Sequence, residues 1–373
     1  MTFGFGKNIQ KRQEIFILVN FVTGNFPFNN LAKKTLRHTV QYITMKSPLI
    51  LAIDTSCDET CAAVSRGRKI LSSVVDSQIN IHQKYGGVVP FLAKRSHEAK
   101  IDYVVKEALK RARIKNFKSV AVTIGPGLAP ALEVGISYAK TFNKPIIPVN
   151  HLEGHMLSAF INIPPRGGMF PALGLIVSGG HTELVLVKKI GQYRLLGQTL
   201  DDAAGEALDK LAKMLKLGYP GGPIIEELAK KGNPDAVKLP IPMQHSNDLN
   251  FSFSCLKTAA LYQIKSVGTV PTEKFIDDMC AGFQKAISIS LTAKLKKAIM
   301  QYQPKSLLLG GGVFSNLYLR HAIKKAVKIP IFYPKQKKYF TDNAAMIAVA
   351  ASFYQGQTFG KNLDRQPNLN FLV

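Results

Sequence analysis

The sequence has few cysteines, few acidic residues and no long apolar run. Four cysteines in 373 residues are too few for a disulfide scaffold and indicate a reducing compartment. The longest early apolar run, residues 15–22, is interrupted by Asn20 and falls far short of the roughly 20 residues of a membrane-spanning helix. It also lacks the small-residue cleavage pattern of a signal peptide. We therefore expect no membrane span and no membrane partner.

Acidic residues are scarce relative to basic ones. The chain has 24 Asp and Glu against 49 Lys and Arg, for a net charge of +25. A cytoplasmic enzyme that acts on small neutral metabolites does not need this balance. Nucleic acid, an acidic membrane surface or a generally basic proteome would each account for it. Leaving out residues 1–48, which hold seven basic residues and one acidic residue, still gives 42 − 23 = +19, so the excess belongs to the main body.

Residues 1–48 differ from the rest of the chain. Their basic, acid-poor composition is typical of a mitochondrial presequence, which would place the protein in mitochondria. The favoured alternative is an upstream start codon, because Met45-Lys46-Ser47-Pro48 directly precedes the first well-formed strand. This N-terminal extension is therefore assigned no fold, and a cytoplasmic location is preferred.

The main body divides into two halves that begin with the same pattern of predicted strands. In the first half, strands are predicted at 49–54, 61–66, 69–77, 119–124 and 145–149, and helical stretches at 88–98, at 101–112 and from about 128 to 142. After the Pro-Pro-Arg-Gly-Gly linker at 164–168, the second half is predicted to have strands at 172–177, 183–188, 193–199, 306–309 and 329–333. Its helices are predicted at 203–215, up to residue 300 after an irregular stretch ending near 271, at 317–326 and at 343–354.

Two halves that each begin with a three-strand meander indicate a duplication. The pattern predicts an α/β protein with a mixed sheet in each lobe and a central cleft. That outline is similar to the actin/Hsp70/sugar-kinase superfamily, whose lobes clamp a nucleotide between them. We expect an N-terminal lobe over 49–167 and a C-terminal lobe with a helical insertion over 168–373.

Two histidines have the spacing of a metal-binding pair. His151 and His155 are four residues apart, so on a helix they would project from one face. Glu153 would lie roughly 200° around that helix from His151, which argues against the general base of a zinc protease. Asp342 offers a third ligand, and such a set suits Fe(II) or zinc. The plainer alternatives are an exposed polar face for the histidines and a helix N-cap for Asp342.

Two strand-to-strand turns carry further chemistry. In the turn at 177–182 the glycines would let backbone N–H groups approach phosphate or carboxylate oxygens, although a plain hairpin explains them nearly as well. Its counterpart at 54–60 holds three carboxylates, which suits acid/base work, a metal or ribose contacts, or else a solvated turn. A third glycine run at 310–312, followed by Asn316, lacks both the dinucleotide fingerprint and the P-loop lysine.

A helix with an acidic face follows the second meander. Asp202, Glu206 and Asp209 recur at helical spacing opposite an apolar stripe that contains Leu208 and Leu211. An exposed acidic face is the usual explanation, and a face turned toward a ribose or an amine is the alternative. The Tyr-Pro-Gly-Gly-Pro run at 219–223 is interpreted as a tight turn that shapes a pocket.

Ten sequence motifs together indicate a protein family. They occur in this order: Asp54-Thr-Ser-Cys-Asp-Glu-Thr60, His97, Gly125-Pro-Gly127, Asn150-His-Leu-Glu-Gly-His155, Val177-Ser-Gly-Gly-His-Thr182, Asp201-Asp-Ala-Ala-Gly-Glu206 with Asp209-Lys210, Tyr219-Pro-Gly-Gly222, Phe251-Ser-Phe-Ser254, Gly310-Gly-Gly-Val313 and Asp342-Asn-Ala-Ala-Met346. Over about residues 47–354 the chain resembles the TsaD family, the universal tRNA threonylcarbamoyladenosine transferases, and is closest to its bacterial members.

The resemblance implies transfer of threonylcarbamoyl from threonylcarbamoyl-AMP to the exocyclic amine of an adenosine, with release of AMP. That adenosine adjoins the anticodon in tRNAs that read codons beginning with A. The motifs imply that one divalent metal per subunit, Fe(II) in preference to zinc, is held by His151, His155 and Asp342. They imply an adenylate and threonyl site at Ile176, Val177, Ser178, Gly179, Gly180, Asp209, Gly222 and Asn316. Asp58 and Glu59 resemble a catalytic acid pair in the cleft.

The resemblance also bears on partners. Bacterial relatives work with TsaB and TsaE, whereas mitochondrial ones act as homodimers, and this sequence does not choose between them. Two residues depart from the family pattern: Cys255 stands where glycine is usual, and Asn250 where an acid is common. A side chain at 255 would crowd the cleft if that position needed a positive φ. The alternative function is a non-catalytic, adenylate-binding scaffold that recruits partner proteins, with a carbohydrate kinase a distant third.

Overall fold

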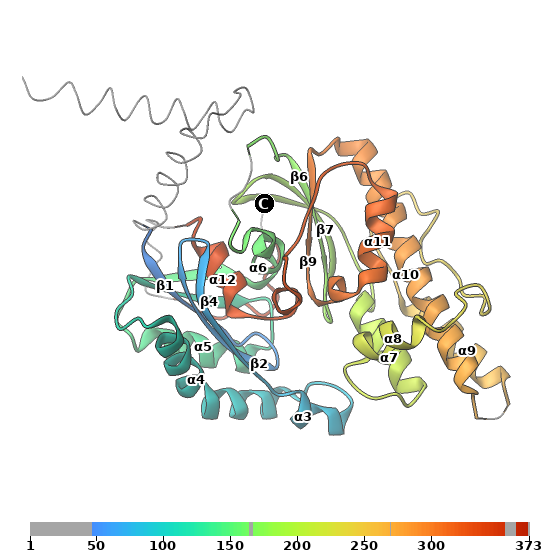
Figure 1. Cartoon of the computed structure of the whole chain (residues 1–373), viewed down its shortest axis with the longest axis horizontal. Coiled ribbons are helices and arrows are strands. Elements are labelled where there is room, and N and C mark those ends of the chain that lie inside the picture. The colour runs from blue at the N-terminus through green and yellow to red at the C-terminus, as the bar shows by residue number, and fades with distance from the viewer. Residues whose placement is uncertain (1–46, 164–166, 269, 355–362, 372–373) are drawn as a thin grey trace, which may run out of the picture.

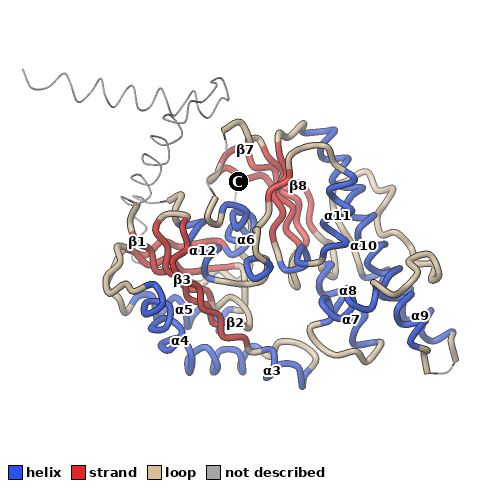
Figure 2. Tube along the Cα trace, in the orientation of Figure 1, coloured by secondary structure: helices blue, strands red, loops and turns tan. Residues whose placement is uncertain are grey.

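A computed structural model describes residues 47–163, 167–268, 270–354 and 363–371. Most of the predicted N-terminal extension and residues 164–166 of the predicted linker lie outside the described residues. Two five-stranded sheets stand apart in the molecule, with helices between them and on their outer faces (Figures 1 and 2).

The first sheet has the strand order β3-β2-β1-β4-β5. The three strands of the opening meander pair antiparallel, and β4 and β5 then add in parallel to β1. Its strands are β1 (Leu49–Asp54), β2 (Glu59–Arg66), β3 (Lys69–Ser77), β4 (Ser119–Gly125) and β5 (Ile146–Asn150).

The second sheet repeats this topology, with the order β10-β9-β6-β7-β8. Strands β6, β7 and β8 form the antiparallel meander, and β9 and β10 add in parallel to β6. Its strands are β6 (Ala172–Val177), β7 (Thr182–Lys189), β8 (Gln192–Gln198), β9 (Ser306–Gly310) and β10 (Ile331–Phe332). Matching strand orders confirm the predicted pair of mixed α/β lobes.

The outer helices cover one face of each sheet. On the first sheet, α4 (Pro90–Ala112) and α5 (Ala129–Lys140) pack on β2, β3 and β4, and α3 (Ile79–His82) precedes them. The outer core of the second sheet takes residues from α7 (Ala204–Met214), α8 (Gly221–Ala229), α9 (Ser254–Ser266), α10 (Glu273–Tyr302) and α11 (Leu317–Ala326). Apolar residues at helical spacing explain this packing: Ile101, Val104, Val105 and Ala108 of α4 are all buried.

Two further helices lie between the sheets, and each packs against the sheet of the other half. Helix α6 (His151–Leu157) follows β5 of the first sheet but contacts β6 and β9 of the second. Helix α12 (Ala344–Ala351), near the C-terminus, contacts β1, β2 and β3 of the first sheet. The two helices also pack on each other, and Figure 1 shows them side by side in the centre. Gly154 permits this approach, because a Cβ there would lie 2.9 Å from Cδ1 of Ile347.

The structure corrects several local predictions. The stretch expected to be irregular up to residue 271 contains α8 and α9, and residues 221–223 of the predicted turn at 219–223 are the first residues of α8. Helical stretches expected separately at 88–98 and 101–112 form the single helix α4, and the last strand is only two residues long. Short 3-10 turns also occur, at Gln83–Tyr85 (η1), Ser158–Phe160 (η2), Gly312–Ser315 (η3) and Lys337–Tyr339 (η4). Within the described residues, no helix is both long and apolar enough to cross a membrane.

Candidate active site

Three predicted ligands meet where the two central helices touch. Nε2 of His155 lies 3.0 Å from Oδ1 of Asp342, and Nε2 of His151 lies 3.5 Å from the same oxygen. One ligand atom from each of the three residues falls within 4.8 Å of the others. The His155 side chain is fully buried, whereas 23% of the Asp342 side chain is exposed. The cluster is therefore open to solvent on its aspartate side.

Capping side chains explain why these residues face one another. Asn150 caps α6 by accepting hydrogen bonds from the backbone N–H groups of Leu152 and Glu153. Helix α12 is capped by Asn343, whose side chain accepts from Met346 N. The alternative role of Asp342 as an N-cap is therefore wrong: its neighbour caps the helix, and its carboxylate turns toward the histidines.

A second carboxylate lies behind His151. Oδ2 of Asp54 is 3.3 Å from Nδ1 of His151, and Oγ of Ser56 is 3.1 Å from the same nitrogen. Asp54 also accepts a hydrogen bond from the backbone N–H of Ser56, which fixes the turn after β1. Burial alone would lower the pKa of His151, but the charges of Asp342 and Asp54 raise it well above its usual value. A carboxylate on the far nitrogen of a histidine is the usual support for a metal ligand.

The donor set of this cluster fits a divalent metal. Two imidazole nitrogens and one carboxylate oxygen suit iron or zinc and leave coordination positions open. Neither ring nitrogen of the buried His155 has a hydrogen-bond partner among the described residues, although its Nε2 is aimed at Asp342. An orphaned buried nitrogen is costly unless something binds its lone pair. A cation at this point would satisfy it.

Glu153 is directed away from the cluster. The carboxylate is buried and accepts hydrogen bonds from the hydroxyls of Tyr193 and Tyr354. Burial raises the pKa of Glu153, and the two hydroxyls oppose that rise. This arrangement agrees with the helical argument that Glu153 is not the base of a zinc protease.

The predicted acid pair lies next to the cluster. Asp58 is buried in the turn before β2, and Glu59 is half-buried at the start of that strand. Burial, and then the charges of Asp342 and Asp58, raise the pKa of Glu59 well above its usual value. The three carboxylates, brought together from opposite ends of the chain, therefore lie within electrostatic reach of one another.

A buried hydrogen-bond network fixes the turn that bears Asp58. His97 Nε2 lies 3.0 Å from the carbonyl of Cys57, which can only accept, so this nitrogen carries the proton. Nδ1 of His97 then accepts from Thr60 Oγ1 and Gln78 Nε2. The backbone N–H of Gln78 donates in turn to the carbonyl of Asp58. The sequence motif contained His97, but its positioning role emerges only from these contacts.

The glycine turn of the second lobe faces the same cluster. Burial, followed by the nearby imidazoles of His151 and His155, lowers the pKa of His181 to about 4. Ser178 closes the turn by donating its backbone N–H to the carbonyl of His181. Gly179 and Gly180 are exposed, and a Cβ on either would meet no atom within 4 Å. Helix α7 begins beside them, since a Cβ on Gly205 would lie 2.4 Å from the carbonyl oxygen of Ser178.

The other predicted substrate residues are more dispersed. Ile176 and Val177 are fully buried in the core, so only their backbones are available to a ligand. Asp209 accepts from the backbone N–H of Gly221 at 2.7 Å, and burial raises its pKa. Gly222 is the next residue of α8 and has open space at its Cβ position. Asn316 is buried and caps α11, and its amide nitrogen donates to Gln284.

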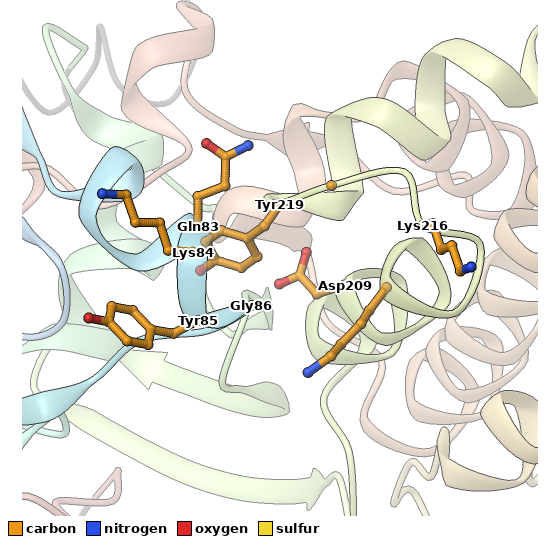
Figure 3. A pocket seen from close by; sticks show the side chains of 9 residues that line it. Gln83, Lys84, Tyr85, Gly86, Asp209, Lys216 and Tyr219 are labelled. Carbon is orange, nitrogen blue, oxygen red and sulfur yellow. The ribbon is translucent and has the colours of Figure 1, made fainter.

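The expected acidic face of α7 is not a single face. Asp202 lies before the helix, and both it and Glu206 pair with Lys210, at 2.6 Å and 2.9 Å. Asp209 lies apart from them, at the cleft beside Tyr219 (Figure 3). The apolar stripe was predicted correctly, since Leu208 and Leu211 are buried. Spacing alone could not show that a lysine within the helix would neutralise two of the three acids.

The two departures from the family pattern fit their surroundings. Cys255 is an exposed residue of α9 with helical geometry, so the predicted crowding through a positive φ does not occur. The Asn250 side chain accepts a hydrogen bond from the backbone N–H of Gln198 at 3.1 Å.

Comparisons with known proteins find one family for this chain. A family model named TsaD, described as tRNA N6-adenosine threonylcarbamoyltransferase, matches residues 69–349. A protein of that name from Trichlorobacter lovleyi is 48% identical over 316 residues, covering 82% of this chain and 91% of that protein. Another from Thermosipho melanesiensis is 46% identical over 331 residues, covering 86% of this chain and 99% of that protein.

Solved structures share the fold at low sequence identity. Full-length HypF in its phosphate- and nucleotide-bound form has a TM-score of 0.55 at 13% identity, covering 84% of this chain and 57% of that one. Component A of the Acidaminococcus fermentans (R)-2-hydroxyglutaryl-CoA dehydratase has a TM-score of 0.50 at 14% identity, covering 83% and 99%. With the two repeated sheets, these likenesses confirm the predicted fold class of actin, Hsp70 and the sugar kinases.

Proposed function

The chain belongs to the TsaD family of tRNA N6-adenosine threonylcarbamoyltransferases, and we propose that its cleft uses threonylcarbamoyl-AMP as the donor. It is a transferase that modifies adenosine in tRNA. The acceptor we propose is the exocyclic amine of the adenosine next to the anticodon in tRNAs that read codons beginning with A. The leaving group is AMP. The observation that carries the proposal is the convergence of both imidazole Nε2 atoms on Asp342 inside the cleft.

His151, His155 and Asp342 would hold one divalent metal, with iron preferred and zinc the alternative. Support comes from the donor set, the orphaned Nε2 atom of His155 and the carboxylate of Asp54 behind His151. A metal there would polarise or orient the carbonyl that is attacked. The intact triad also favours the enzyme over the alternative of a non-catalytic scaffold.

The second lobe would bind the donor. Residues 176–180 would contribute mainly through the backbone of the exposed turn, because Ile176 and Val177 are buried. The adjoining N-terminus of α7 favours an anionic group such as the phosphate of the adenylate. Asp209, Gly222 and Asn316 would line the rest of the donor site. For Asn316 the role is one of shaping the site, since its side chain is engaged in capping α11.

Asp58 is the group we propose as the proton acceptor for the attacking amine. An aromatic amine is a weak nucleophile, so removing its proton during attack assists the reaction. Glu59, whose pKa is raised by burial and by its acidic neighbours, would hold a proton beside it. Closure of the two lobes would exclude water, which otherwise hydrolyses the adenylate. His97 would keep the Asp58 turn in position.

The partners follow from this chemistry. tRNA is the substrate of the family, and a net charge of +25 suits a polyanion. TsaB and TsaE are the protein partners we propose for a cytoplasmic protein, and a homodimer is the alternative if the protein is mitochondrial.

The test is nucleoside analysis of tRNA after incubation with the purified full chain, synthetic threonylcarbamoyl-AMP and iron or zinc, with and without TsaB and TsaE. We expect modified adenosine with the wild-type chain and none with His151→Ala. His321→Ala, an exposed histidine on α11, is the matched control and should behave as wild type. Equal product from His151→Ala and wild type would refute the metal assignment. Absence of product under every condition would refute the proposed reaction.

A further inference from the structure

A pocket opens where the two lobes meet, and of the residues assigned so far to donor and metal only Asp209 lines it. Its volume is about 380 Å³. The first lobe contributes residues 83–86 and the second contributes Asp209, Lys213, Lys216, Gly218 and Tyr219 (Figure 3). The lobes approach closely here, because a Cβ on Gly86 would lie 3.3 Å from Nζ of Lys213.

The inner wall of this pocket adjoins the acid pair. Tyr219 is half-buried, and its pKa is raised by burial and then by the charges of Asp58 and Asp209. Asp58 also raises the pKa of Asp209, so these groups from opposite lobes lie within electrostatic reach of one another. In Figure 3 the Tyr219 ring lies between Gln83 and Asp209. The pocket therefore lies within electrostatic reach of the acids beside the metal ligands.

The outer edge of the pocket carries three exposed ammonium groups. These residues, which we call the lysine rim, are Lys84, Lys213 and Lys216. Within the part of the chain that the structure describes, none of them has a carboxylate at ion-pair distance. Lys210, on the same helix as Lys213, is paired with both Asp202 and Glu206. The lysine rim is thus free to bind an external anion.

Charge changes sign from the rim to the floor. The rim is basic, whereas the lining also holds the carboxylate of Asp209, which lies within electrostatic reach of Asp58. A nucleic acid fits this order, because its phosphates would stay at the rim while an uncharged base reached the acids. In Figure 3, Lys84 and Lys216 lie on opposite sides of the Tyr219 ring. A polymer with successive phosphates can use both sides, whereas an adenylate has a single phosphate.

We propose that this pocket binds the anticodon loop of tRNA around the acceptor adenosine, with backbone phosphates on the lysine rim and a base against the ring of Tyr219. The inference rests on the proposed function, which supplies the RNA substrate. Base stacking on a tyrosine ring is a common means of holding unpaired nucleotides. The rim lysines would supply the salt-dependent part of the affinity.

The experiment measures binding of a fluorescent, unmodified anticodon stem-loop RNA to the full chain by anisotropy over a range of KCl concentrations. The variant replaces all three rim lysines, Lys84→Gln, Lys213→Gln and Lys216→Gln, which are exposed and leave the core unchanged. Each lost phosphate contact lowers the slope of log Kd against log salt by about 0.7–0.9, so we expect a decrease of about 2. Kd at low salt should rise at least about tenfold.

Lys325→Gln, an exposed lysine on α11, is the matched control and should keep the wild-type slope. At Tyr219, the Phe variant should bind the RNA as wild type, whereas Tyr219→Leu should weaken binding several-fold. An unchanged salt slope in the triple variant would overturn the proposal.

A second titration with AMP separates the two possible sources of a nucleotide. AMP affinity should be unchanged in the triple variant. If AMP binding falls and RNA binding does not, the pocket belongs to the donor and the proposal is wrong. If wild-type protein binds RNA through the rim but forms no modified adenosine, the proposed reaction fails while the RNA pocket stands.

Discussion

The two lobes present corresponding four-residue turns with opposite chemistry. Residues 55–58 join β1 to β2 and are mostly buried. The hydroxyl of Ser56 is hydrogen-bonded to His151, and the carbonyl of Cys57 accepts a hydrogen bond from His97. Residues 178–181 join β6 to β7 and contain two exposed glycines without contacts at their Cβ positions. The same strand topology thus occurs twice. One copy places carboxylates rigidly, and the other leaves backbone amides open to an anion.

Removing a metal ligand should have the largest effect on activity, because both turns face the metal ligands. His155→Ala should lower transfer at least about 10³-fold, since a bound metal contributes several kcal/mol to such reactions. The rate of modified adenosine formation under saturating donor checks this. The control variant His321→Ala should keep the wild-type rate. A His155→Ala protein within tenfold of wild type would show that the cluster is not needed for transfer.

A buried acid distinguishes β7 from its counterpart β2 in the first lobe. Glu183 pairs with Ile176 as Ala62 pairs with Ile53 in the first lobe, and burial raises the pKa of Glu183 to about 7. Because the pKa of this acid is higher in the folded than in the unfolded state, the protein loses stability as the pH rises. The loss begins near the ordinary pKa of 4.5 and is complete above about pH 7. The difference corresponds to about 3 kcal/mol.

Glu183→Gln should therefore raise Tm at pH 8 by several degrees and have little effect near pH 4.5. Thermal unfolding followed by circular dichroism at the two pH values measures this. An equal shift at both pH values would contradict the ionisation account.

The acid turn can be tested separately from the glycine turn. Asp58→Asn should lower kcat about 10²-fold, because a general base contributes about that much. KM for the donor should change little, since the donor is assigned to the other lobe. Steady-state kinetics at several donor concentrations separate the two parameters. A rise in KM alone would move Asp58 from proton transfer to donor binding.

The glycine turn should show the smallest effect and the reverse pattern. Gly180→Ala adds a methyl group that meets nothing in the protein, so Tm should stay within about 1 °C. The methyl would stand where an anion approaches, and Kd for AMP should rise about tenfold, equivalent to about 1.4 kcal/mol. Calorimetric titration with AMP measures this.

A glycine that packs against the first-lobe turn should behave in the opposite way. Gly127 has φ +157°, and a Cβ there would lie 2.5 Å from the carbonyl oxygen of Ser56. Gly127→Ala should therefore lower Tm by several degrees through steric overlap. Equal loss of stability at positions 127 and 180 would remove the contrast between the turns.

Much of the fold could be predicted from the sequence, because strands of β-branched and apolar residues ended at clear glycine, proline or polar turns. Helix α8 was missed for a physical reason. The Pro220-Gly221-Gly222-Pro223 run has the composition of a turn, yet it occupies the first residues of a helix, where proline is tolerated.

The metal cluster could be predicted only in part. Four-residue spacing was enough to pair His151 with His155, but composition could not show that Asn343 rather than Asp342 would cap α12. The supporting side chains were harder to predict than the ligands, because Asp54, His97 and His181 reach the site through contacts between distant segments.

Metal content of the purified full chain tests the central claim most directly. Elemental analysis of desalted protein should find about one iron or zinc per wild-type chain, and at most a small fraction of that in Asp342→Ala with its fold intact by circular dichroism. The account predicts that modified adenosine disappears from the same Asp342→Ala preparation. A fully loaded Asp342→Ala chain, or a metal-free wild-type chain with full activity, would contradict it.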